Sequence, residues 1–281
     1  MTQALFVLAL LATSIGAGAV GAILGLGGGI LLVPVLTMFF GVNLHYAMGA
    51  SLISVIATSS GAAAYLTSGL SNIRIGLFLA MATTTGAITG AALTGVVPER
   101  FLQLTLGLAL GYCAWVTFRQ LDVEIPAAAA PDALAVRFGL EGTYYDRSLG
   151  TRVSYRATRV GPGLAAMYGA GLLSGLLGIG SGAFKVLAMD YFMGLPMKVS
   201  TATSNFMIGI TAAASAGIYF GRGDIHPVIV TPVAVGILLG AYLGTRLMAG
   251  LRNATVRKLF LPVLIYLAVA MALRGLGVWT R

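Results

Sequence analysis

The strongest constraint in this chain is a glycine cluster that occurs twice within apolar sequence. Gly25-Leu26-Gly27-Gly28-Gly29 is followed by a short apolar run and then by Ser51. Gly178-Ile179-Gly180-Ser181-Gly182 is followed by a second short run and then by Ser204-Asn205. Matching glycine-broken hydrophobic segments in two halves are the best sequence indication of a substrate site in a secondary transporter. The sequence therefore predicts two homologous repeats.

Composition places the chain in a membrane. Hydrophobic residues make up 58% of the sequence and charged residues only 9%, against about 25% charged in soluble domains. A soluble globule could not bury so much apolar surface, so we expect a multi-pass protein of the plasma membrane, with the lipid bilayer as its surroundings. The net charge of +9 does not indicate nucleic-acid binding, because no basic stripe with interleaved aromatic residues is present.

Apolar runs of spanning length define the expected helices. The candidates are residues 4–24, 48–66, 75–97, 101–118, 164–177, 199–220, 228–249 and 256–273. Each half also holds a shorter run, 30–40 or 183–193, which as a helix would cover about half the hydrocarbon thickness. The predicted fold is all-α, with about four full spans and one glycine-initiated half-helix in each repeat. Whether the short runs cross, giving eight or ten crossings and parallel or inverted repeats, is left open.

The predicted organisation is a first transmembrane repeat (1–118), a polar linker (119–160) and a second transmembrane repeat (161–281). Within the linker, Arg152-Val153-Ser154-Tyr155-Arg156 alternates between polar and apolar residues, and Gly150 supplies a turn. This pattern predicts a small β-hairpin. Because an isolated hairpin is marginally stable, it should lie against a partner subunit or the cytoplasmic face of the bundle, unless the linker is a plain connector.

Glycines four residues apart predict close helix contacts. Gly86 and Gly90 form one such pair, and Gly236, Gly240 and Gly244 form a longer series. This spacing lets two helix backbones approach closely in lipid. The contacts could be internal or could form the seam of a homodimer.

The glycine clusters are the first candidate site. Gly27, Gly28 and Gly29, and their counterparts Gly180 to Gly182, permit an unwound backbone, which is costly at membrane depth unless it lines a cavity or meets a ligand. The N–H groups that begin the following helix favour an anion. We therefore predict a small anionic substrate here; the alternative is that the glycines serve only tight packing.

Lys185 is the second candidate, because an ionisable residue inside an apolar run is a functional hypothesis by default. Its counterpart in the first half is Leu32. The charge is therefore not a requirement of the fold that the two repeats share. An ammonium near the start of a half-helix would reinforce an anion site. The alternatives are that Lys185 pairs with Asp190 or extends to the membrane interface.

Polar residues after each half-helix complete the candidate set. Ser51, Ser204 and Asn205 could orient a bound oxyanion, or could bond their own backbone or a neighbouring helix. His45 and His226 keep no clear spacing to a carboxylate or a nucleophile, and no metal-ligand cluster is present in the sequence. We therefore expect no enzyme activity and no cofactor, apart from coupling to a proton or sodium gradient.

These residues carry a resemblance to a known family. Gly25 to Gly29 with Pro34, Gly178 to Gly182 with Lys185, and the run from Gly194 to Phe206 are similar to the TauE/SafE family of sulfite exporters and membrane transporters. The resemblance spans both repeats and implies a transporter of small anions such as sulfite, sulfonates and other organosulfur compounds. We expect an exporter; the alternatives are a passive anion channel and a membrane scaffold or sensor acting through the hairpin.

Overall fold

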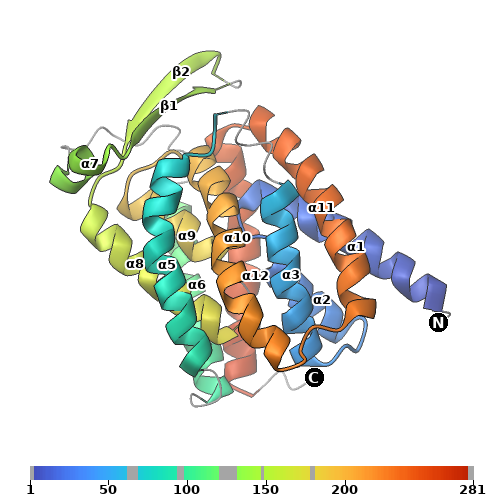
Figure 1. The fold of residues 1–281 in the computed structure, drawn as a ribbon. Coiled ribbons are helices and arrows are strands. Elements are labelled where there is room, and N and C mark those ends of the chain that lie inside the picture. The colour runs from blue at the N-terminus through green and yellow to red at the C-terminus, as the bar shows by residue number, and fades with distance from the viewer. Residues whose placement is uncertain are drawn as a thin grey trace.

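A computed structural model describes residues 3–61, 69–93, 98–119, 132–146, 149–177 and 181–277. The chain is mostly helical, with one small hairpin at one end of a helical bundle (Figure 1). The helices of the first half are α1 (Gln3–Leu24), α2 (Gly29–Met38), α3 (Leu44–Gly61), α5 (Ile73–Leu93) and α6 (Glu99–Arg119). Next come α7 (Ala133–Phe138), β1 (Glu141–Asp146) and β2 (Thr151–Arg156). The second half contains α8 (Val160–Leu177), α9 (Gly182–Leu187), the π-helix η1 (Ala188–Phe192), α10 (Met197–Gly221), α11 (Pro227–Gly250) and α12 (Asn253–Gly275).

Each long apolar run of the sequence corresponds to a helix, so the helical fold class is confirmed. Among the described residues, four helices are long and apolar enough by themselves to cross a membrane: Leu5–Leu24, Ile73–Leu93, Pro227–Gly250 and Ala254–Gly275. Tyr46–Ser60 and Val160–Leu176 are shorter apolar helices. The choice between eight and ten crossings therefore stays a prediction.

The two short segments have the predicted half-length. Helix α2 has 10 residues, or about 15 Å at 1.5 Å per residue. Helix α9 has 6 residues and continues directly into η1 with 5 more. Single π-helical turns such as η1 occur often at functional sites.

The helices of one half pack mainly on helices of the other half. Helix α1 lies along α11, α5 along α8, α6 along α12 and α3 along α10 (Figure 1). The spaced glycines are at two of these seams: a Cβ at Gly236 would lie 2.7 Å from the carbonyl oxygen of Leu11, and one at Gly86 would collide with Tyr168 of α8. These glycine contacts are therefore internal. This crossed pairing is the one expected of two related halves, although the repeat itself stays a prediction.

The predicted hairpin is present and is docked on the bundle. Strands β1 and β2 pair antiparallel, with Glu141 opposite Arg156, and Gly150 has a left-handed φ of 67° in the turn. Asn72, just before α5, donates from Nδ2 to the hydroxyl oxygen of Tyr155 at 3.1 Å. Burial raises the pKa of the Tyr155 phenol, and the hydrogen bond from Asn72 opposes that effect. The docking of the hairpin on the bundle, one of the predicted alternatives, is confirmed.

A buried ion pair joins the hairpin to α10. Lys198 Nζ lies 2.7 Å from Asp146 Oδ1, and both side chains are almost completely buried, at 1% and 0% exposure. Tyr144 donates its hydroxyl proton to Asp146 Oδ2 at 3.2 Å. On the other side of the linker, the ring of Phe138 in α7 lies 4.9 Å from that of Phe78 in α5. The linker is thus an integral part of the packed structure.

Candidate functional site

The first break in the helices is made by glycines in a conformation that other residues rarely adopt. Gly25, Gly27 and Gly28 have φ of 73°, 80° and 66°, the left-handed region that favours glycine. The chain turns sharply there between α1 and α2, and Gly28 is the N-cap of α2. Gly29 lies against α3, since a Cβ added to it would be 2.5 Å from Ser51 Oγ. Gly29 of the first glycine cluster therefore lies against Ser51, and a ligand-binding role for these residues stays a prediction.

The second break meets the first inside the bundle. Gly180 lies outside the described residues, but Gly182, the first residue of α9, is in direct contact with the backbone of Gly25 and Leu26. A Cβ at Gly182 would lie 2.6 Å from Leu26 Cα. Ser204 of α10 bridges the two breaks, donating to the carbonyl oxygen of Gly25 at 2.9 Å and to that of Gly182 at 3.4 Å. The described part of the second cluster thus meets the first cluster at one crossing point, made by Gly182 with Gly25 and Leu26.

Side chains from α3 and α10 satisfy carbonyl oxygens that the first break leaves exposed. Asn205 Nδ2 donates to the Ala22 carbonyl oxygen at 2.8 Å, and Thr58 Oγ1 donates to that of Gly27 at 2.9 Å. The last carbonyls of a helix have no partner within the helix, and in a membrane they must find one elsewhere. Ser204 and Asn205 therefore hold the break in place as well as lining it.

Several buried oxygens around this crossing keep hydrogen-bonding capacity. Ser51 Oγ, Ser181 Oγ, Thr201 Oγ1 and Asn205 Oδ1 are buried without a hydrogen-bond partner among the described residues. Unsatisfied buried polar groups are uncommon in native proteins and call for a specific explanation. Each of the three hydroxyls can donate a hydrogen bond to an anion, whereas Asn205 Oδ1 can only accept a hydrogen bond.

Lys185 is fully buried inside the helical bundle. Its side chain has 0% exposure, and Nζ donates to Thr211 Oγ1 of α10 at 2.8 Å. Neither alternative proposed from the sequence is observed, because the ammonium is not at a surface and forms no ion pair with Asp190 or any other described carboxylate. Thr211 in turn lies 3.3 Å from Thr83 Oγ1 of α5. Lys185 therefore connects α9, α10 and α5.

The direction of the Lys185 side chain follows from the way α9 runs along α10. Near the start of α9, Gly182 is close to Ser204 of α10. Four residues later, Val186 lies close to Gly25, as does Thr201, which precedes Ser204 in α10. The two helices therefore run antiparallel. Thr211 lies seven residues beyond Ser204, or about 10 Å along α10. The Lys185 ammonium therefore lies on the N-terminal side of Lys185, beside Thr211 of α10.

Sequence reasoning missed Thr83, Thr211, Asp146 and Lys198. Thr211 could have been found, because Ser204, Thr211 and Ser215 follow one another at helical spacing on a single face of α10. Thr83 belongs to a run of three threonines in an apolar helix, which is a weaker signal. The pair of Asp146 and Lys198 has no local signal, since 52 residues separate the partners.

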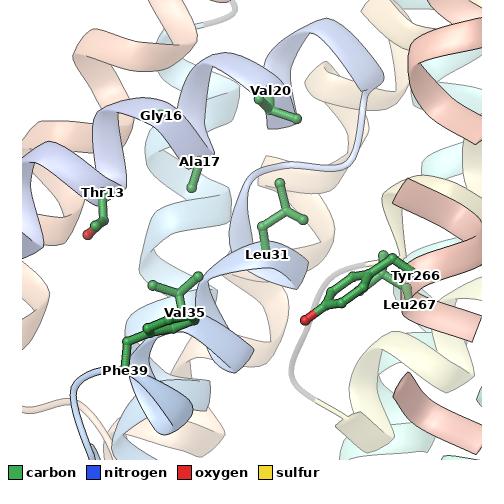
Figure 2. Close-up of a pocket in the computed structure, with 9 residues that line it drawn as sticks. All are labelled: Thr13, Gly16, Ala17, Val20, Leu31, Val35, Phe39, Tyr266 and Leu267. Carbon is green, nitrogen blue, oxygen red and sulfur yellow. The ribbon is translucent and has the colours of Figure 1, made fainter. Parts of the chain in front are cut away.

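A separate apolar cleft lies on another side of α2. It has a volume of about 350 Å³, and Figure 2 shows Leu31 and Val35 of α2 facing Val20 of α1 and Tyr266 of α12 across it. Of its two lining hydroxyls, that of Thr13 already donates to the Ala9 carbonyl oxygen at 2.8 Å. This apolar cleft does not suit a small anion.

Close contact at the crossing makes Gly182 intolerant of a side chain. Gly182→Ala is expected to lower the free energy of unfolding by about 1–3 kcal/mol, because the new methyl group must displace backbone atoms of Gly25 and Leu26. The matched control is Gly217→Ala in α10, where nothing lies within 4 Å and alanine should stabilise the helix by about 0.5–1 kcal/mol. Chemical unfolding in mild detergent measures both. Equal stability of the two variants would show that the breaks do not touch.

The helices, the two touching breaks and the buried polar groups define a class of protein, the multi-pass helical membrane transporters. Comparison with known families makes the assignment specific. The chain belongs to the sulfite exporter TauE/SafE family, whose sequence profile matches residues 10–271. The resemblance inferred from the glycine motifs is thereby confirmed, together with the expectation of a multi-pass membrane protein.

Curated relatives agree with this assignment. The probable membrane transporter protein YunE of Bacillus subtilis (strain 168) is 26% identical over 268 residues, which cover 92% of this chain and 95% of YunE. The probable membrane transporter protein YdhB of the same organism is 29% identical over 226 residues, or 79% of this chain and 82% of YdhB. No solved structure gives a significant match.

Proposed function

We propose that this protein is a secondary transporter that exports a small oxyanion, such as sulfite, a sulfonate or another organosulfur anion, across the plasma membrane. The observation that carries the proposal is the contact between the two breaks, beside a fully buried lysine. The residues of the proposed site are Gly27, Gly28, Gly29, Ser51, Gly180, Ser181, Gly182, Lys185, Ser204 and Asn205. Transport would be driven by a proton or sodium gradient.

The packing of the crossing favours a carrier over a passive channel. Gly25 to Gly29, Gly182 and Ser204 are buried, and the two breaks touch directly. An anion could reach donors packed in this way only if the two halves moved apart on one side at a time. Such alternation around a fixed site is how transporters built from two repeats work.

The hairpin is better explained as part of the transporter than as a separate sensor. Its buried ion pair with Lys198 ties it to α10, the helix that also carries Ser204 and Asn205. Because this pair is buried, neither charge is accessible to a partner protein. We therefore assign the hairpin a role in holding α10.

Counterflow in proteoliposomes tests the proposal. Vesicles loaded with unlabelled sulfite or methanesulfonate should take up the labelled anion faster than unloaded vesicles, because a carrier returns faster when it is loaded. Protein-free liposomes give the background leak. A flux without such acceleration would indicate a channel, and no flux of any sulfur oxyanion would contradict the proposed substrate class.

A further inference from the structure

The buried charges of the bundle are unevenly distributed. Among the described residues, the buried charged side chains are Asp146, Lys185, Asp190 and Lys198. Asp146 and Lys198 neutralise each other at the hairpin. Asp190 is on η1, five residues after Lys185, which is about 7 Å along a helix axis. Because helical side chains lean toward the N-terminus, the Lys185 ammonium extends away from Asp190.

Lys185 therefore has no neutralising partner among the described residues, and some of its N–H donors form no hydrogen bond with these residues. An ammonium carries three N–H donors, and Thr211 accepts one of them. The equivalent position of the first half, Leu32, is apolar and fully buried. Among the described residues, one ammonium thus lies on the α9 side of the crossing and none on the α2 side, and this ammonium has two N–H donors available to a ligand.

We infer that the bound substrate is a monovalent oxyanion, such as hydrogen sulfite or a monosulfonate, and that the single Lys185 ammonium selects it against divalent anions of the same shape. The inference rests on the proposed function and specifies its substrate class. One negative charge is neutralised by one ammonium, and two of the anion's oxygens can accept the two remaining N–H donors. A divalent anion leaves a net charge in a dry site, and an uncompensated buried charge is strongly unfavourable.

The hydroxyl groups nearby cannot neutralise the second charge of a divalent anion. Ser51, Ser181 and Thr201 offer neutral donors, and Thr211 already donates to the Met207 carbonyl oxygen at 3.0 Å. Neutral donors stabilise an oxyanion but leave its charge in place. The number of ammonium groups therefore sets the charge that the site accepts.

Methanesulfonate and sulfate form a matched pair of probes, because both are tetrahedral sulfur oxyanions and they carry one and two charges. Flux of each is measured in proteoliposomes at the same concentration with the membrane potential clamped at zero. The native protein should move methanesulfonate at least about tenfold faster than sulfate. Lys185→Gln should lose methanesulfonate flux by a similar factor, whereas Lys258→Gln, on the exposed start of α12, should keep the native ratio.

The possible results distinguish a failure of the monovalent selectivity from a failure of the proposed transport function. Native protein that moves sulfate as fast as methanesulfonate would overturn the monovalent selectivity and leave the proposed function standing. A native ratio that survives unchanged in Lys185→Gln would also overturn it, because the selectivity would then come from other residues. If the native protein moves no sulfur oxyanion at all, the proposed function fails, and the inference with it.

Discussion

Lys185→Met is expected to lower anion flux by about a hundredfold while leaving the protein as stable as the native chain or more so. Lys185 carries the only charge among the described residues of the proposed site, and preorganised charges of this kind typically contribute several kcal/mol to a bound anion. In the empty protein the same charge is a cost, since it is out of water without a carboxylate partner among the described residues. Flux in proteoliposomes and thermal unfolding in detergent give the two readouts.

The split between the two readouts distinguishes a ligand-binding lysine from a structural one. A structural lysine would lose stability when its hydrogen bond to Thr211 is removed, and flux would fall in proportion to the folded fraction. Lys185→Arg serves as the conservative variant, since it keeps the charge and should retain part of the flux. Full flux through Lys185→Met would remove Lys185 from the proposed site.

Local sequence was sufficient to predict the long helices, the two short helical segments and the hairpin of this fold, but it did not predict the short helix α7. The glycine runs predicted both breaks, because few other residues adopt the left-handed conformation of Gly25, Gly27 and Gly28. The lengths of the apolar runs predicted the half-helices α2 and α9–η1. Alternation of residue type around Gly150 predicted the hairpin.

The arrangement of these elements could not be predicted in the same way. The bond from Ser204 to the Gly25 carbonyl oxygen spans 179 residues, and the pairing of α1 with α11 joins opposite ends of the chain. One sequence has no signal for such contacts, because both helices of each pair are apolar on several faces. Lys185 illustrates the limit: the sequence left open whether its side chain is buried or extends to the membrane interface, and it did not identify Thr211 as its partner.

The ion pair under the hairpin links the linker to the candidate site. Lys198 is in the first turn of α10, and Ser204 follows about 9 Å further along the same helix. A hairpin that fixes the start of α10 therefore also fixes the residues that bridge the two breaks. The hairpin in the linker therefore has a structural role, which is to hold the start of α10 in the second half of the chain.

Asp146→Asn is expected to destabilise the protein by about 3–5 kcal/mol, because it removes the carboxylate charge that pairs with the Lys198 ammonium, which is buried at 1% exposure. Unfolding in mild detergent measures the loss. The matched control is Glu141→Gln on the same hairpin, which breaks the exposed pair with Arg156 and should change stability by about 1 kcal/mol at most.

The double variant Asp146→Leu with Lys198→Met decides what the ion pair contributes. Replacing both charges with apolar side chains of similar size removes the desolvation cost along with the attraction, so stability should return to within about 1–2 kcal/mol of the native protein. Anion flux need not return with it, because an apolar contact does not fix the start of α10 in one orientation as a hydrogen-bonded pair does. Recovery of stability without recovery of flux would show that the hairpin positions α10 for transport. If Asp146→Asn lowered neither protein stability nor anion flux, the ion pair would be solvated and the linker would be only a connector.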